Sequence, residues 1–247
     1  TSSTSSRIVT SDGLVLVNDS LKGLRFDQGE LENRPMKYHT LAVPVGGEYH
    51  FTLVDGTRVW VNSASEVRFP NCFSGERREI YVKGEVYLEV ARDEEHPFVV
   101  HAGENEVRVL GTRFNLTAYP DEQKVVTTLV EGSVRVNVGS RFVVIKPDQQ
   151  FTFNTKNGTI EVNKVDAARK VMWKDGVLVI DNEAFRDVIW KLERWYGVAI
   201  VNETGLVFTQ SFSGEFDRED IHVAIESLCA NLNITYMMDK DRIILKR

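Results

Sequence analysis

Acidic side chains are the most plentiful groups in this sequence that could carry out catalysis. The 247 residues include 36 Asp and Glu, and hydrolysis of a glycosidic bond uses two carboxyls held across a cleft. Asp55 and Glu131 each stand directly before a glycine, as turn-forming residues do. Glu85 and Glu89 alternate with valine and leucine, so both should lie on the solvent side of one strand. The spacing favours turn and surface positions over a catalytic pair, and we expect no enzymatic activity.

Histidine and cysteine form no recognisable metal-binding pattern. The five histidines are scattered, without an HExxH sequence or a helical i, i+4 pair: His39, His50, His96, His101 and His222. Cys72 and Cys229 are far apart and have no neighbouring ligand at the spacing of a zinc site. We therefore expect no metal and no cofactor, and two free, largely buried thiols.

Aromatic side chains keep a glycan-directed function open as an alternative. A carbohydrate-binding module needs exposed coplanar rings, and Trp60, Tyr81 and Tyr87 are candidates. Trp60 stands between Val59 and Val61, so the ring and the two valines must occupy opposite sides of a strand. A β-solenoid enzyme acting on glycans is the related alternative, although no carboxylate pair points to it.

Charge and hydropathy narrow the class of protein further. The formal net charge is -6 and the pI is near 5.5, which disfavours nucleic acid because such binding depends on Lys and Arg. No apolar run approaches the roughly 20 residues that a membrane helix requires. The chain begins with Thr and a polar stretch over residues 1–6. We expect a fragment whose anchoring or targeting segment lies outside this sequence.

The pattern of short β-branched runs predicts a mainly β fold. Residues 1–40 read as an extended lead-in, and residues 41–168 as an all-β domain. Four pairs of a polar residue and a glycine suggest tight turns between strands: Asp55-Gly56, Lys83-Gly84, Glu131-Gly132 and Asp175-Gly176. The expected body is a stack of hairpins, either β-solenoid-like or a sandwich.

Residues 169–247 predict a small α+β domain in the order β-α-β-β-α-β-β. The first helix carries apolar residues at helical spacing, with Asp181 and Glu183 at its start and Gly197 just past its end. In the second helix, Asp217 is the expected N-cap. Both helices should pack on one sheet.

Several ordered blocks resemble the periplasmic region of FecR-like anti-sigma factors. They are LVDGTRVWVNSASEVRFP from Leu53, GEVYLEVARDEEHPFVV from Gly84, VLGTRFNLTAY from Val109 and TLVEGSVRV from Thr128. WKDGVLVIDNEAFRDVIWKLERWYGVAI, from Trp173, resembles the short α+β domain of the subfamily associated with polysaccharide uptake. The matching positions, which we expect to be structural, are Asp55, Gly56, Asn62, Ser65, Gly84, Glu85, Pro97, Phe98, Gly111, Thr112, Phe114, Asn115, Glu131, Gly132, Trp173, Gly176, Tyr196 and Gly197.

The resemblance implies a role in cell-surface signalling. Such proteins cross the inner membrane once, and a cytoplasmic segment holds an extracytoplasmic-function sigma factor. The present chain would be the periplasmic part, whose expected partner is the signalling domain of a TonB-dependent outer-membrane transducer. Intramembrane and periplasmic proteases would then release the sigma factor.

Overall fold

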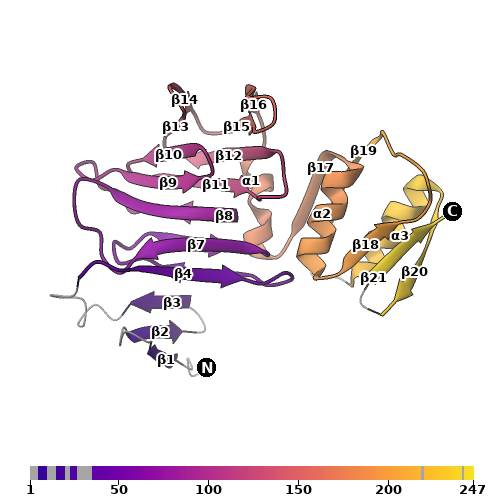
Figure 1. The fold of residues 1–247 in the computed structure, drawn as a ribbon, viewed down its shortest axis with the longest axis horizontal. Helices are drawn as coiled ribbons and strands as arrows, with labels where there is room; N and C mark the ends of the chain where they lie inside the picture. The colour runs from indigo at the N-terminus through magenta and orange to yellow at the C-terminus, as the bar shows by residue number, and fades with distance from the viewer. Residues whose placement is uncertain (1–4, 10–14, 20–22, 27–34, 218–219, 241) are drawn as a thin grey trace. The chain divides into compact units, whose positions relative to one another are not determined.

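The computed structural model describes residues 5–9, 15–19, 23–26, 35–217, 220–240 and 242–247 (Figure 1). The chain divides into two compact units. The first contains residues 1–43 and 48–171, and the second contains 44–47 and 172–247. Within the predicted lead-in, residues 1–4, 10–14, 20–22 and 27–34 lie outside the described residues. Its described parts form β1 (Ser5–Val9), β2 (Val15–Asp19) and β3 (Gly23–Phe26).

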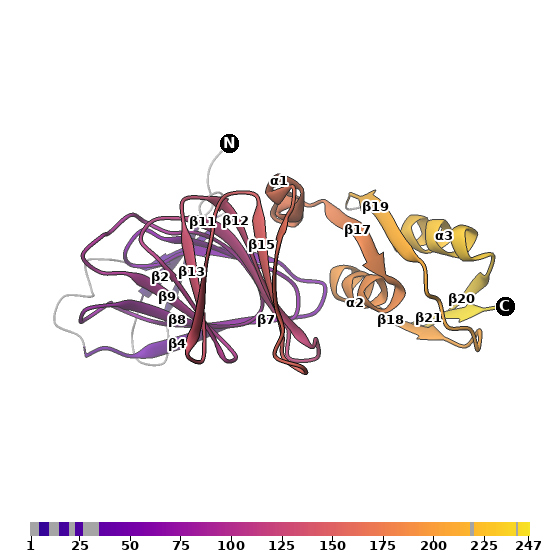
Figure 2. The ribbon, with the colours of Figure 1, turned by 90° about the horizontal axis from the view of Figure 1, so that it is seen from above.

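Two sheets that share one long strand build the first unit. The first sheet has the order β1-β2-β3-β5-β6-β8-β11-β12-β15-β16, and the second contains β4, β7, β8, β9, β10, β13 and β14 (Figures 1 and 2). The bounds are β4 (Tyr38–Val43), β5 (Tyr49–Thr52), β6 (Arg58–Val61), β7 (Ser65–Pro70), β8 (Arg78–Glu89), β9 (Phe98–Ala102), β10 (Asn105–Val109), β11 (Arg113–Ala118), β12 (Lys124–Glu131), β13 (Val134–Val138), β14 (Arg141–Ile145), β15 (Gln149–Asn154) and β16 (Ile160–Lys164).

The core of the first unit is made by alternate residues of these strands. Fully buried members include Phe51, Phe98, Phe114 and Phe151, with Leu88 on the shared strand. Side chains alternate across a strand, so the inward residues of each strand stand two apart. The mainly β fold is thus confirmed, and its form is a sandwich of two sheets.

Strand β8 overturns one predicted turn. The Lys83-Gly84 pair was expected to reverse the chain, but β8 runs from Arg78 to Glu89 without interruption. Its first half pairs with β7 and β9, and its second half pairs with β6 and β11. Gly84 has φ +96°, a conformation that suits glycine and here bends the strand from one sheet into the other.

The other predicted turns differ in outcome. Asp55-Gly56 joins β5 and β6, which pair antiparallel as a hairpin. Glu131-Gly132 does not form a hairpin, because β12 pairs with β11 and β15 whereas β13 pairs with β10 and β14. This turn instead carries the chain between sheets. Asp175 ends the short helix η2 (Met172–Asp175), and Gly176 leads into β17.

The second unit has the predicted order of elements. It contains β17 (Leu178–Ala184), α2 (Phe185–Tyr196), β18 (Ala199–Asn202), β19 (Ser211–Phe216), α3 (Ile221–Leu232), β20 (Thr235–Asp239) and β21 (Arg242–Lys246). The preceding helix α1 (Ala167–Lys170) belongs to the first unit. Val188 and Leu192 of α2 share a core with Ile225 and Leu228 of α3. The second unit therefore has a hydrophobic core of its own.

Three details of the predicted α+β domain are wrong. The strands form two sheets, β17-β19 and β18-β21-β20, rather than one. Asp181 and Glu183 lie within β17, because a left-handed Asn182 (φ +53°) makes a bulge that prolongs the strand. The N-cap of α3 is Asp220, whose side chain accepts a hydrogen bond from the His222 N–H, and not Asp217. Gly197 is the left-handed C-cap of α2, as predicted.

Candidate functional site

A buried ion pair organises the first group of motif positions. Arg78 donates through Nη1 to Asp55 Oδ2 at 2.7 Å and to the Ala91 carbonyl at 2.9 Å. Its Nε donates to the carbonyl of His96, 2.8 Å away. The exposed fractions of the two charged side chains are 4% for Arg78 and 12% for Asp55. The guanidinium thus fastens the Asp55-Gly56 turn to the segment that leads into Pro97 and Phe98.

Asp55 also closes its own turn. Its Oδ1 accepts from the Thr57 N–H at 3.0 Å, and its Oδ2 accepts from the Thr57 hydroxyl at 2.8 Å. The pattern identified Asp55 as a turn former, but it gave no sign of Arg78. Alternation within β8 makes Arg78 an inward residue, in register with the buried Ile80. The sequence did contain one signal for this ion pair: Arg78 is a charged residue at an inward position of a strand. A buried charge requires a partner of opposite charge.

The second group surrounds the carboxylate of Glu85. Asn62 Nδ2 donates to Oε2 at 2.8 Å, and Asn115 Nδ2 donates to Oε1 at 2.8 Å. The Thr117 hydroxyl is the third donor to the carboxylate, and it donates to Oε1 at 3.2 Å. Glu85 lies on β8, Asn115 and Thr117 lie on β11, and Asn62 directly follows β6; both β6 and β11 pair with β8. These hydrogen bonds connect neighbouring strands of the sheet, and both oxygens of the Glu85 carboxylate accept at least one of them.

Ser65, at the start of β7, contacts the backbone of β8 beside Glu85, at Gly84. The Ser65 hydroxyl accepts from the Glu85 N–H at 2.8 Å and donates to the Ser63 carbonyl at 3.1 Å. A Cβ on Gly84 would lie 2.2 Å from Ser65 Oγ and 2.7 Å from Ser65 Cα. The close approach explains why glycine stands where β8 passes between the sheets.

Gly84→Ala is expected to lower the free energy of unfolding of the first unit by about 3–4 kcal/mol, because overpacking adds to backbone strain. Gly56→Ala is the matched control. Its φ is +86° but nothing lies within 4 Å of the added Cβ, so about 1–2 kcal/mol of strain is expected. Urea unfolding followed by circular dichroism measures both, and equal losses would contradict the steric argument.

The third group lies where β11 begins and β12 ends. The Thr112 hydroxyl donates to the Ser133 carbonyl at 3.1 Å, beyond Gly132. A Cβ on Gly111 would approach Arg92 Cα to 2.8 Å, and one on Gly132 would lie 2.9 Å from Thr112 Oγ1. Both glycines thus allow close passage of neighbouring segments.

Charged side chains form a row across the outer face beside this group. Arg113 pairs with Glu131 at 2.8 Å and reaches Glu89 at 4.0 Å, and Glu89 also contacts Arg58. Phe114, the next residue after Arg113, is fully buried, as expected. Glu85 and Glu89 do face outward, and each is occupied by donors from neighbouring strands. The row provides no free pair of carboxylates.

The aromatic residues do not form a flat platform. Trp60 is half-buried on the face opposite Val59 and Val61, as alternation requires. Its ring stacks near His50 but meets Tyr87 edge-on, at an interplanar angle of 61°. Tyr87 is only 3% exposed, and its burial, aided by the nearby Glu89 charge, raises the pKa of its hydroxyl to about 12. This geometry does not favour the carbohydrate-binding alternative.

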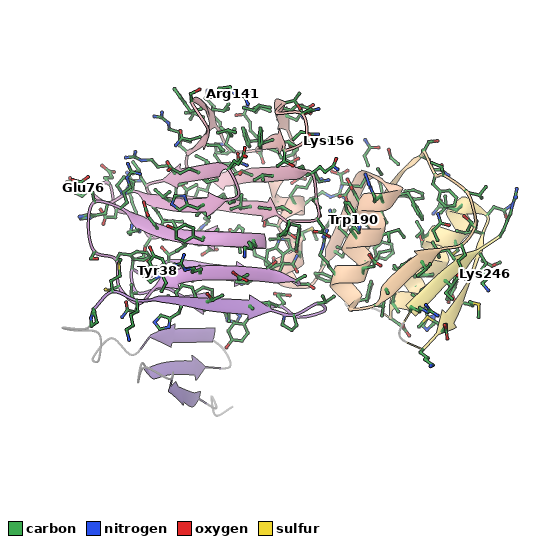
Figure 3. The ribbon with its side chains drawn as sticks, viewed as in Figure 1. Tyr38, Glu76, Arg141, Lys156, Trp190 and Lys246 are labelled. Atoms are coloured by element: carbon green, nitrogen blue, oxygen red, sulfur yellow. The ribbon has the colours of Figure 1, made fainter. Side chains whose placement is uncertain are left out.

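One open pocket of about 350 Å³ lies at the end of the second sheet, near Tyr38 (Figure 3). It is lined by Met36, Tyr38, Pro70, Phe73, Ser74, Glu76, Arg77 and Glu79. Glu79 Oε2 lies 3.8 Å from His101 Nε2. Tyr81 stacks on the His101 ring at 4.7 Å. The lining mixes apolar and oppositely charged groups without a convergent set of donors.

The remaining candidates are isolated. Cys72 is half-buried and Cys229 is buried, both are free thiols, and burial raises the pKa of Cys229. Across the described residues, no group of His, Cys, Asp and Glu is arranged to hold a metal ion.

The motif positions of the second unit occupy capping and turn sites. Trp173 is 5% exposed, and its carbonyl accepts from the Gly176 N–H at 2.9 Å. Tyr196 ends α2, and the Gly197 N–H donates to the Glu193 carbonyl at 2.9 Å. The structure therefore gathers the motif residues into separate local networks rather than one site.

Comparison with known proteins agrees with this arrangement of two units. Residues 39–135 match the family model described as FecR protein, and residues 177–245 match the model described as FecR, C-terminal. Two crystal structures of a protein assigned as an anti-sigma factor in Parabacteroides distasonis, at 2.50 and 1.65 Å resolution, are 29% and 30% identical to the chain. Each match spans 85% of this chain and 99% of the chain in the crystal structure, with a TM-score of 0.81. The chain belongs to the FecR family.

The family matches cover most of the motif positions. The FecR model spans every position from Asp55 to Gly132, and the C-terminal model includes Tyr196 and Gly197 but not Trp173 and Gly176. Strands β14, β15 and β16 lie between the two matched segments. No individually curated protein matches the chain. Among the described helices, none has the length and apolar character to cross a membrane.

Proposed function

We propose that this FecR-family chain is the periplasmic signal-receiving region of a membrane-anchored anti-sigma factor. It binds the signalling domain of a TonB-dependent outer-membrane transducer. Through a cytoplasmic segment outside this sequence, the full protein controls an extracytoplasmic-function sigma factor. Intramembrane and periplasmic proteases complete the relay. The action is regulatory and requires no catalytic group.

The observation that carries the proposal is the ordered pair of family matches over residues 39–135 and 177–245. The relatives from Parabacteroides distasonis, described as anti-sigma factors, support the same role. A relay of this kind needs a surface whose partner binds two states of the protein with different affinity. The ion pair and the amide cluster described above join segments of the first unit to one another, so they suit a scaffold that presents such a surface.

We assign the docking surface to the second unit. Its three-stranded sheet ends at β20, where Met237 and Met238 are 43% and 41% exposed. The other edge, β18, carries Val201 at 38% exposure. Sheet edges with exposed apolar side chains can accept a strand from a partner through main-chain hydrogen bonds. This geometry supports docking at the second unit.

Calorimetric titration with the isolated signalling domain of the transducer encoded beside this protein tests the proposal. We expect saturable binding with micromolar affinity or better. Met238→Asp should weaken it about tenfold, because the change places a charge at the apolar contact. Leu110→Asp is the control, since Leu110 is 44% exposed but belongs to the first unit.

Two results would contradict the proposal at different levels. Absence of binding by folded components would exclude the receiver function for this transducer. Undiminished binding by a folded fragment that ends at Val171, where the first unit ends, would exclude only the assignment to the second unit. Circular dichroism of each protein separates loss of binding from loss of fold.

A further inference from the structure

Strand β14 is an open edge of the second sheet in the first unit. In the described part of the chain it pairs only with β13, and it lies at the upper end of that sheet in Figure 1. Phe142 and Val144 point outward with 57% and 53% of their surfaces exposed. In edge strands with exposed apolar residues, bulges, charges or covering segments usually prevent pairing with another chain. The register of β14 with β13 is unbroken over all five of its residues.

The backbone of the same two residues faces the open side. A two-residue loop, Gly139 and Ser140, joins Val138 to its partner Arg141. In such a hairpin the pair beside the loop exchanges hydrogen bonds and the next pair does not. Phe142 and Val144 therefore direct their N–H and C=O groups away from β13, toward solvent. They offer donors and acceptors in the spacing that another strand requires.

Three arginines lie on β14 and on the two strands that follow it in the sheet, β13 and β10. Arg108 and Arg135 are directly opposite one another on β10 and β13, an arrangement that is unfavourable for like charges. The Arg135 guanidinium lies 4.0 Å from the centre of the Phe142 ring. Arg141 stands at the tip of the β13–β14 hairpin (Figure 3) and donates to the Gly158 carbonyl. Within the described residues, none of these three arginines forms an ion pair.

The acidic residue on this face of β10 already has a hydrogen-bond partner. Glu106 faces Asn137 across β10 and β13, and its Oε1 accepts from Asn137 Nδ2 at 2.9 Å. Lys146 follows β14 directly and is exposed. A chain with net charge -6 thus concentrates cationic and apolar groups at one strand edge. A partner strand with acidic and apolar side chains would be complementary to this edge in charge and in polarity.

We propose that β14 is a strand-addition site for an extended segment of a partner protein with acidic residues on one face and apolar residues on the other. The added strand would pair with Phe142 and Val144, direct its acidic side chains toward Arg135 and Lys146, and cover the half-buried Val143 with its apolar ones. A second copy of the chain is disfavoured, because pairing two β14 edges would bring their cations together. The site lies between the two family-matched segments and is independent of transducer docking.

The probe is the peptide Ac-Glu-Val-Glu-Val-Glu-Val-Glu-NH2, titrated into the full, ¹⁵N-labelled chain. We expect saturable shifts of the Phe142 and Val144 amide signals, and binding that weakens with salt. The Lys-Val peptide of the same length should bind at least about tenfold more weakly, because its charges repel the edge.

Val144→Pro tests the role of the backbone. It removes an N–H that faces solvent, a position at which an edge strand tolerates proline, and should weaken binding about tenfold. Val162→Pro is the matched control on the edge strand β16. The hydrogen bonds from the Asn154 N–H to the Thr159 carbonyl and from the Val165 N–H to the Asp148 carbonyl place the Val162 N–H on that open edge, so its loss should leave affinity unchanged.

Arg135→Glu keeps the proposal testable if the proline variant does not fold. It should reverse the preference between the acidic and basic peptides. Equal affinity for both peptides, or shifts confined to residues outside β13 and β14, would overturn the proposal. Preferential binding of single-stranded DNA or of phosphatidylglycerol vesicles at this edge would overturn it in favour of a phosphate-bearing ligand. None of these measurements involves the transducer, so failure here leaves the receiver function untouched.

Discussion

Asp55→Ala is expected to lower the free energy of unfolding of the first unit by about 3–5 kcal/mol, because it leaves a buried guanidinium without its counter-charge. Arg78 is 4% exposed and donates to Asp55 at 2.7 Å. The two carbonyls that it also contacts, those of His96 and Ala91, cannot neutralise its charge. The variant also removes the acceptor that closes the turn onto Thr57. Urea unfolding monitored by circular dichroism measures the loss.

A double variant and a second aspartate provide the controls for this prediction. Asp55→Ala combined with Arg78→Met should lose less stability than Asp55→Ala alone, since no charge remains buried. Asp175→Ala changes another Asp-Gly pair, but the Asp175 side chain is 66% exposed and pairs with Lys174 at the surface. Its removal should have little effect. A loss below about 1 kcal/mol for Asp55→Ala would show that water replaces the missing carboxylate.

Local pattern was sufficient to predict much of this architecture. Alternation placed Glu85 and Glu89 outward and Phe114 inward, and the structure confirms all three. The α+β order emerged because each helix carries a distinct apolar face and Gly197 ends the first. These features depend on residues close in sequence. Their physical cause is therefore visible in a short stretch of chain.

Long-range pairing could not be predicted in the same way. Gly84 and Gly56 have similar positive φ values, +96° and +86°, yet one bends a continuous strand and the other closes a hairpin. The difference arises from which strands are available to pair on either side, and local sequence does not encode that. Likewise, the partner of Arg78 lies 23 residues away at Asp55. The networks around Glu85 and Arg78 join residues that are distant in sequence, so they can be recognised only from the pairing of the strands.

Phe114→Ala is expected to cost about 3–5 kcal/mol of the stability of the first unit, through lost burial and the cavity that remains. Phe114 is fully buried at the start of β11. Its neighbour Asn115 faces the opposite side and donates to Glu85. Asn115→Ala should therefore cost about 1–2 kcal/mol, because Asn62 and Thr117 still satisfy the carboxylate. Denaturant unfolding of the two variants gives the comparison.

The same pair of variants tests whether the family motif serves folding or recognition. If the motif positions hold the sandwich together, the folded fraction of each variant should bind the transducer domain with unchanged affinity, because its surface is preserved. Titrations corrected for the folded fraction measure this. A loss of affinity in Asn115→Ala that exceeds its loss of folded protein would instead place the Glu85 cluster in the partner contact. The polar network on the outer face of β6, β8 and β11 would then be the receiving surface, and the second unit would have a different task.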